Sequence, residues 1–232
     1  MIQWARAFFI LLAFFFPFGV SASTDEMESM RALAEQGHPG AQYALATKYL
    51  EADKGDPQNR EEAAKWLRKA AEQGHARAQY NLGVMYAKGD GVPRDGVEAI
   101  AWIRKAAEQG YVVAQNSLAV AYLQGDDGVT QDKGEAAKWF LEAAEQGFAM
   151  AQNNLGVMYE TGDGVVQNKV EAAKWYRKAA EQGHAVAQNN LGTLYVKGDG
   201  VPQDRVEAIK WYRKAAEQGY VDARHNLSLM QK

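Results

Sequence analysis

Few residues of this 232-residue chain have the types and spacings that enzyme chemistry requires. The chain contains no cysteine, which excludes a thiolate nucleophile, a disulfide and any Cys-ligated metal site. No His-Glu-x-x-His motif is present, and Ser29, Ser117 and Ser228 lack the Lys three residues later that a Ser-x-x-Lys nucleophile needs. The sequence therefore predicts that the protein is not an enzyme and has no catalytic residue, no metal site and no cofactor.

The remaining candidates for metal binding are histidines and Gly-Asp-Gly segments. Three of the four histidines, His38, His75 and His184, directly follow an Ala-Glu-Gln-Gly segment. In the other copies the same position holds an aromatic residue, Tyr111, Phe148 or Tyr220. A position filled by either kind of ring is typical of packing at a helix end. His225 has no second ligand nearby in sequence. The Gly-Asp-Gly segments lack the alternating oxygen ligands and closing Glu of a calcium loop, so they predict tight turns.

The charge pattern gives no reason to propose a nucleic-acid partner. The chain has 26 basic and 29 acidic residues, a net charge of −3. Each of four Arg-Lys pairs is followed by a Glu four residues after the Arg, the spacing of a surface ion pair on a helix; these pairs are Arg68/Lys69, Arg104/Lys105, Arg177/Lys178 and Arg213/Lys214. In one further copy the pair becomes Leu141/Glu142, which leaves open a partner contact on the outer face.

The first 22 residues have the pattern of a signal peptide. Arg6 precedes an apolar run from Ala7 to Phe18, and small residues follow, with a predicted cleavage site after Ala22. The run is shorter than the ~20 apolar residues of a membrane span, although an uncleaved anchor is the alternative. We therefore expect a periplasmic or secreted protein with no stable membrane insertion after cleavage.

The rest of the sequence is one unit repeated. The tetrapeptide Ala-Glu-Gln-Gly occurs six times, ending at Gly37, Gly74, Gly110, Gly147, Gly183 and Gly219, with intervals of 36 or 37 residues. A fixed period in this range predicts a solenoid of helical hairpins.

Each unit is predicted to form two helices. The first has apolar or small residues every fourth position, such as Ala78, Leu82 and Tyr86, and contains Gly83, whose recurrence predicts close helix–helix approach. The second begins with a capping box, Asp or Asn followed three residues later by Glu. The predicted capping residues are Asn59, Asp95, Asp132, Asn168 and Asp204. Five full hairpins and a half-repeat at each end give about 12 helices.

A unit such as residues 187–219 closely resembles the Sel-one-like repeat, a relative of the tetratricopeptide repeat. The resemblance implies an all-α, right-handed α/α superhelical solenoid and a role as a protein-interaction scaffold. It also implies a bacterial envelope, signalling or host-contact role for an exported member. The predicted organisation is a signal peptide at 1–22, an N-terminal capping helix at 23–37 and a solenoid at 38–232. Its units are 38–74, 75–110, 111–147, 148–183, 184–219 and the half-repeat 220–232.

Tetratricopeptide geometry implies a concave groove lined by first-helix residues at fixed offsets. Carried over to this sequence, the groove residues are Tyr43, Arg77, Tyr80, Val84, Lys88, Asn116, Val120, Met150, Asn153, Val157, Asn189, Thr193 and Lys197. Our hypothesis is that Asn116, Asn153 and Asn189 hold an extended protein segment through their amides, and that Tyr43 and Tyr80 grip one end of it. The alternative is that these amides bond across adjacent helices and stiffen the stack.

The leading interpretation is an exported, non-catalytic adaptor that binds a protein or extended peptide of unknown identity in its groove. One alternative is an envelope hydrolase acting on peptidoglycan or β-lactams. Some cysteine-rich members of the family bind or hydrolyse β-lactams, but this chain lacks their cysteines. Another is a structural spacer, which would not need a groove whose lining changes from Tyr43 to Asn116 or from Arg77 to Met150.

Overall fold

The computed structural model describes residues 21–52, 56–125 and 128–230, so residues 1–20 of the predicted signal peptide lie outside it. Within these ranges the chain forms twelve helices and no strand, which confirms the predicted all-α solenoid. The helices are α1 (Ser21–Glu35), α2 (Pro39–Glu51), α3 (Pro57–Glu72), α4 (Ala76–Lys88), α5 (Gly96–Glu108), α6 (Val112–Gln124), α7 (Lys133–Glu145), α8 (Ala149–Thr161), α9 (Lys169–Glu181), α10 (Ala185–Lys197), α11 (Arg205–Glu217) and α12 (Val221–Met230).

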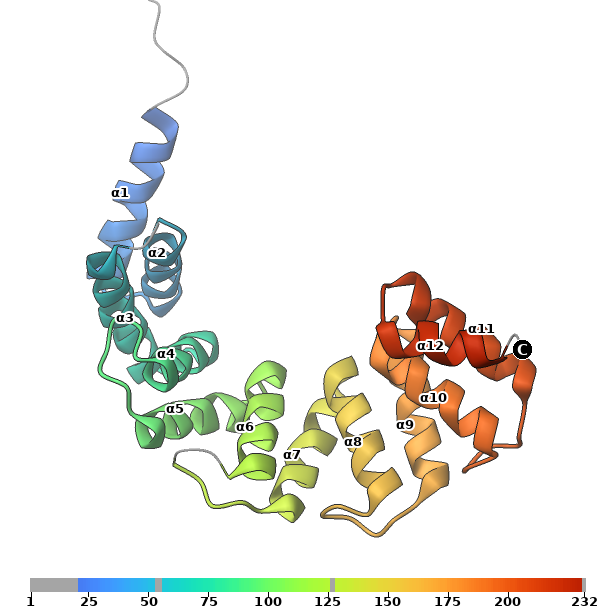
Figure 1. Cartoon of the computed structure of the whole chain (residues 1–232). Helices are drawn as coiled ribbons and strands as arrows, with labels where there is room; N and C mark the ends of the chain where they lie inside the picture. Colours follow the sequence, from blue (N-terminus) through green and yellow to red (C-terminus); the bar gives the residue numbers. More distant parts are fainter. Residues whose placement is uncertain (1–20, 53–55, 126–127, 231–232) are drawn as a thin grey trace, which may run out of the picture.

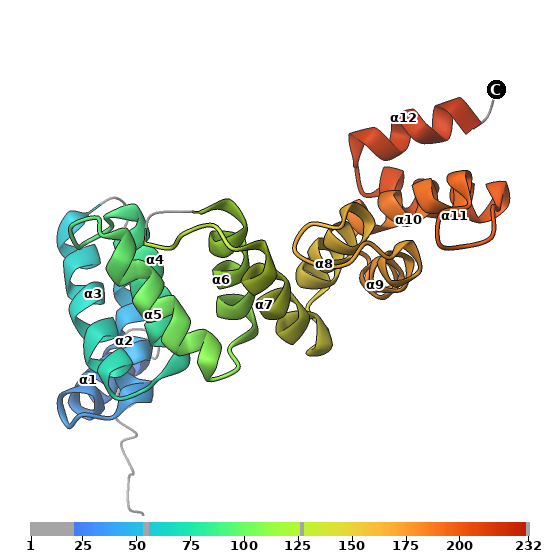
Figure 2. The same cartoon turned by 90° about the horizontal axis from the view of Figure 1, so that it is seen from below.

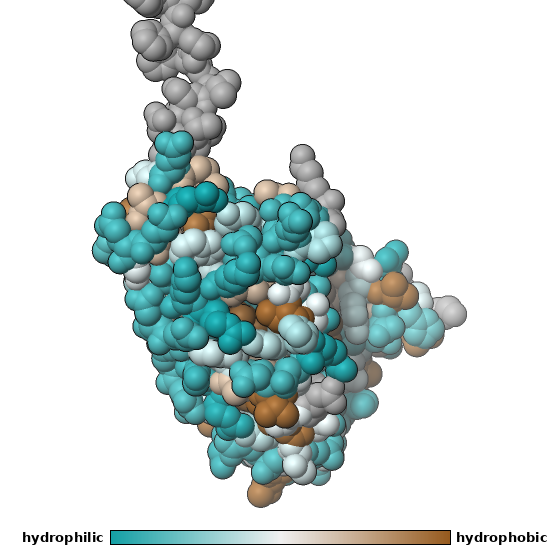
Figure 3. All heavy atoms as spheres, turned by 90° about the vertical axis from the view of Figure 1, so that its left-hand side faces the viewer, coloured by the Kyte–Doolittle hydropathy of each residue, from teal (hydrophilic) through white to brown (hydrophobic). Residues whose placement is uncertain are grey.

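The helices stack as antiparallel hairpins along an arc (Figure 1). The even-numbered helices are the first helices of the units and the odd-numbered helices are the second. From α2 to α8, Figure 1 shows the first helices on the inner side of the arc and the second helices on its outer side. Viewed from below, the N-terminal and C-terminal repeats are displaced from one another, as in a superhelix (Figure 2). The outer side over the N-terminal repeats is mainly hydrophilic (Figure 3).

Side-chain caps begin most of the second helices, as predicted. The Asp95 carboxylate accepts a hydrogen bond from the Glu98 amide at 3.0 Å, and Asp132, Asn168 and Asp204 act in the same way. The prediction for Asn59 is wrong, because α3 begins earlier, at Pro57, with Asp56 as its cap. Proline fits the first helical position, where no amide hydrogen is needed, and Asp56 accepts from the Gln58 amide at 3.0 Å.

The recurring glycines of the first helices allow close helix packing, as predicted. A Cβ atom at Gly156 would lie 2.6 Å from Tyr176 Cδ1, and one at Gly83 would lie 2.7 Å from Ile103 Cγ1. Both distances are shorter than any relaxed contact, so the two helices of a hairpin could not approach this closely with a larger residue. Ala46 and Ala119 occupy the same place in other units and are fully buried.

A ladder of glutamines joins consecutive units. From α2 to α10, the buried glutamine of each first helix donates from Nε2 to a backbone carbonyl at the end of the preceding second helix, over 3.0–3.3 Å. Its Oε1 accepts from the Gln of the next Ala-Glu-Gln-Gly segment, over 2.6–2.8 Å. The buried members are Gln42, Gln79, Gln115, Gln152 and Gln188. The Gln–Gln bond therefore joins the two helices of one unit, and the Gln–carbonyl bond joins that unit to the preceding second helix.

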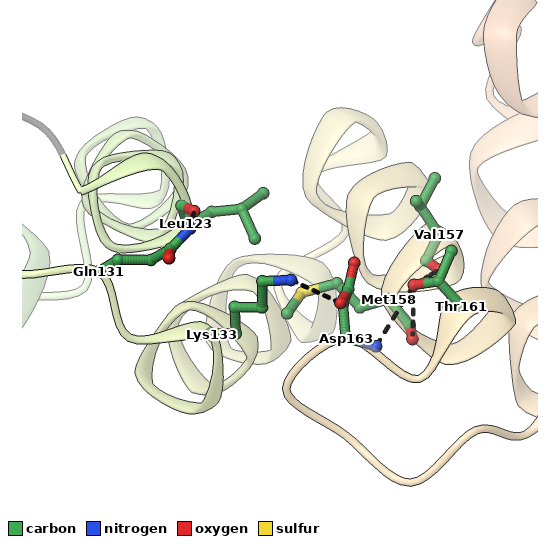
Figure 4. A network of polar contacts seen from close by, with 7 residues as sticks. All are labelled: Leu123, Gln131, Lys133, Val157, Met158, Thr161 and Asp163. Atoms are coloured by element: carbon green, nitrogen blue, oxygen red, sulfur yellow. Dashed lines mark hydrogen bonds and ion pairs between the residues drawn. The ribbon is translucent and has the colours of Figure 1, made fainter.

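Tight turns complete the units and contact the unit before. In the fourth unit, Gly164 has a φ of +73° and packs against the backbone of Lys133, at the start of α7. Lys133 Nζ lies 2.6 Å from Asp163 Oδ1 in the same turn, and the Asp163 amide donates to Thr161 Oγ1 over 3.3 Å (Figure 4). Arg60–Asp90 and Lys169–Asp199 are the equivalent ion pairs. The aspartates of these turns thus pair with basic side chains of the protein itself.

Candidate protein-binding groove

The predicted groove residues lie on the first helices, which form the inner side of the arc from α2 to α8 (Figure 1). We call the surface formed by these thirteen residues the inner face. Two of its apolar members are well exposed, Met150 at 49% and Val157 at 39%, and both lie on α8. Arg77, Lys88 and Lys197 are also exposed. The half-buried members are Tyr43, Tyr80, Val84, Val120 and Thr193.

The three asparagines of the inner face are buried, at 7–8% exposure. Asn153 Oδ1 accepts a hydrogen bond from Asn190 over 3.2 Å, and Asn189 Oδ1 accepts from Asn226 over 2.9 Å. Each of these bonds joins the first helices of consecutive units. These two amide oxygens are therefore used within the stack, as the stiffening alternative requires.

Asn116 differs from the other two asparagines. Its Oδ1 is buried and has no hydrogen-bond partner within the described part of the chain, while its Nδ2 lies 3.8 Å from Met150 Sδ. Asn154, the counterpart of Asn190 and Asn226 in the fourth unit, accepts from Asn153 Nδ2 instead, over 3.5 Å. The amide connection between first helices is thus incomplete between the third and fourth units.

The two tyrosines of the inner face also contact the next unit. The Tyr43 ring stacks on the His75 imidazole with 4.7 Å between centroids. The Tyr80 ring meets Tyr111 edge-on at 5.5 Å, and its hydroxyl lies 3.4 Å from Ser117 Oγ. Both rings remain half-buried, so one side packs against the protein and the other is accessible.

Other polar groups near the inner face are paired inside the protein. The Tyr176 hydroxyl donates to Glu160 Oε2 over 2.7 Å, and burial together with this hydrogen bond strongly raises the pKa of Tyr176. Thr193 Oγ1 lies 3.0 Å from the Tyr212 hydroxyl. Among the described residues, no three His, Asp or Glu side chains are grouped so that they could hold a metal ion. The arrangement offers contact surface and hydrogen bonds.

The outer side departs from the sequence prediction. The arginines of the Arg-Lys pairs do not pair with the Glu four residues later within the described ranges. Instead Arg68 and Arg177 donate to the tyrosine hydroxyl of the following first helix, Tyr86 or Tyr195. The tyrosine offers the guanidinium a hydrogen bond and a ring contact together, whereas an exposed carboxylate offers no ring contact.

Comparison with known proteins identifies the unit. The family model for the Sel1 repeat matches residues 39–75, 76–111, 112–148, 149–184 and 185–220. The chain belongs to the Sel1 repeat family. Sel1 repeat proteins are commonly non-catalytic scaffolds for protein–protein interaction. Every described helix of this Sel1 repeat protein falls short of the length and apolar character that a membrane span requires.

Two solved structures are similar over most of the chain. One is a protective antigen present in uropathogenic Escherichia coli strains, displaying an SLR fold, with a TM-score of 0.83 and 41% identity. The match covers 88% of this chain but only 43% of the E. coli chain. The other is a Sel1 repeat protein from Oxalobacter formigenes, with a TM-score of 0.77, 34% identity and coverage of 91% and 84%. A comparison of the chain with curated proteins found no match.

The structure also assigns roles that sequence reasoning missed. Each of the five full units has an Ala-Gln pair at the same position, and all five glutamines are buried, so their constancy was a usable signal for a structural role. His75 and His184 accept hydrogen bonds at Nδ1 from the Ala78 and Ala187 amides and so cap α4 and α10. Their alternation with aromatic residues concealed this second role.

Proposed function

We propose that this Sel1 repeat protein is an exported adaptor that binds a protein or peptide segment along its inner face. The observation that carries the proposal is the pair of exposed apolar side chains on α8, Met150 and Val157. The residue type at the position of Met150 differs between units, being Arg77 in the second unit, whereas the residue types at the buried Ala, Leu and Gln positions hardly change. Exposed apolar side chains at variable positions are typical of a recognition surface.

The burial of the asparagines moves the proposed contacts to their exposed neighbours. Because Asn153 and Asn189 use their oxygens within the stack, they position the helices that present Met150 and Val157. Half-buried Val84 and Val120 occupy the position equivalent to Val157 on the preceding first helices. A partner segment with apolar side chains at its centre would bury this surface, which is the main source of affinity in such contacts.

A partner-capture experiment with matched variants tests this function. The bait is the protein beginning at Ser23, exposed to envelope and secreted fractions of the source organism, beside the double variant Met150→Glu/Val157→Glu. We expect the variant to lose its partner, because each Glu places a charge in an apolar contact. The control is Val170→Glu/Val206→Glu, which changes exposed valines of second helices and should keep the partner. If both variants captured the partner equally well, the inner face would be excluded as the binding site.

Export is the second part of the proposal and has its own test. It is supported by the apolar run Ala7–Phe18 with the small residues after it, and by the similarity to an E. coli protective antigen. We expect the periplasmic or secreted protein to begin at Ser23 when its N-terminus is sequenced. Recovery of a chain that begins at Met1 in the membrane fraction would instead indicate an uncleaved anchor.

A further inference from the structure

Four of the five repeats place a lysine ammonium over the tryptophan ring of their own second helix. Lys178 Nζ lies 3.9 Å from the centroid of the Trp175 ring, three residues earlier on the same side of α9. The negative face of an indole attracts a cation. The same contact joins Lys69 to Trp66 and Lys105 to Trp102, both at 4.0 Å, and Lys214 to Trp211 at 4.5 Å. The tryptophan ring of this repeat is thus a cation-binding site.

The third repeat keeps the ring but lacks the cation. Glu142 stands where the other repeats have the lysine, and Leu141 stands where they have the arginine. Leu141 is half-buried and packs against the core cluster of α7 and α8. No cation from the described part of the chain lies over Trp139.

Trp139 lines a surface cavity of about 530 Å³ between the end of α5, the start of α6 and α7. The carboxylates of Glu108, Glu135 and Glu142 also line this cavity. Lys138, the basic residue of the lining, pairs with Glu135 over 2.8 Å. Glu108 and Glu142 make no ion pair within the described ranges. The cavity therefore combines an aromatic ring with uncompensated negative charge.

Two other second helices have a cavity of the opposite charge, on the side of the following unit's turn. The cavity along α3 is lined by two carboxylates and by the cations Lys65, Arg68 and Lys69, and the cavity along α9 has the same balance. Among these three cavities, only the one beside α7, which lost its internal lysine, has a net negative charge.

We propose that the Trp139 cavity receives a lysine side chain of a partner protein, with its ammonium over the indole and near Glu108 and Glu142. In the other four repeats a lysine ammonium lies over the face of the equivalent tryptophan ring, so a lysine ammonium is the group that the open face of Trp139 would bind. The uncompensated carboxylates supply the complementary charge. The cavity lies on the second-helix side, so the site is independent of partner binding at the inner face.

Two substitutions test the site, and both exchange Lys and Glu at the position three residues after the tryptophan, where the chain already uses both residues. Glu142→Lys gives Trp139 an internal lysine, as in the other repeats, and should close the cavity. Lys178→Glu removes the ammonium from Trp175 and should create a second site of the same kind. Circular dichroism checks that both variants fold.

The probe is the peptide acetyl-Gly-Lys-Gly-amide, titrated into ¹⁵N-labelled protein while the indole N–H signals are followed by NMR. We expect the Trp139 signal to move selectively, and not to move with the same peptide acetylated at the lysine Nζ, which has lost the charge. Glu142→Lys should weaken binding about tenfold or more, and Lys178→Glu should make the Trp175 signal move as well.

Three results would overturn the proposal. The first is an equal shift with the acetylated peptide, because the site would then not recognise the ammonium. The second is unchanged binding to Glu142→Lys, because the ring would then not be the site. The third is a Trp139 signal that does not respond to the lysine peptide.

Discussion

At the residue scale, two histidines combine packing with helix capping. His75 Nδ1 and His184 Nδ1 each accept a hydrogen bond from a backbone amide over 3.2 Å. Only a neutral imidazole can do so, because a protonated Nδ1 is a donor. Burial lowers the pKa of both side chains below the ordinary 6.5, and the positive charge of Arg77 lowers that of His75 further.

The lowered pKa predicts that these caps lose stability in mild acid. As the pH falls from about 7.5 to about 5, the unfolded chain binds the proton before the folded chain does, so the free energy of unfolding decreases. His184→Phe should show a smaller decrease, since Phe does not titrate and Phe148 already occupies this position in another unit. Urea unfolding followed by circular dichroism at both pH values measures the difference. Equal decreases in the two proteins would contradict a capping role for His184.

At the scale of elements, internal repetition made the helices predictable from one sequence. Five copies separate constant from variable positions, so the caps and the close approach at Gly83 and Gly156 could be predicted from residue type alone. The prediction failed where the repetition fails. Asp56 stands where the other four units have Val92, Val129, Val165 and Val201, and as a cap it moved the start of α3 to Pro57, ahead of the capping box.

The candidate site was less predictable, because the exposure of a side chain depends on the neighbouring unit. Tetratricopeptide geometry implied a groove lined by the first helices, which lie on the inner side of the arc from α2 to α8. It could not tell whether an amide on these helices faces a ligand or the next helix. Asn153 is bonded to Asn190, 37 positions away, and no pattern within one unit shows that contact. The recurrence of Asn at the equivalent positions 190 and 226 was the one sequence feature that could have indicated these bonds between first helices.

At the scale of the whole molecule, the core is a chain of overlapping clusters. The first cluster runs from Ala46 to Trp102 and the second from Ile100 to Ala121. The third runs from Ala119 to Trp175 and the last described one from Ala172 to Trp211. Extensive helix contacts join only helices that are consecutive in sequence. A solenoid of this kind transmits a perturbation chiefly to adjacent units, because in the described part of the chain the extensive contacts are between neighbouring helices.

This architecture predicts that a core defect remains local. Leu155 is 1% exposed and belongs to the cluster around α7, α8 and α9, so Leu155→Ala should remove about 2–5 kcal/mol of stability from that region. Hydrogen exchange measured by mass spectrometry should become faster in α7–α9 and stay unchanged in α3. Leu67→Ala, in the N-terminal cluster, should give the reverse pattern and serves as the control. Uniformly faster exchange from α2 to α11 would instead show that the repeats unfold as one cooperative unit.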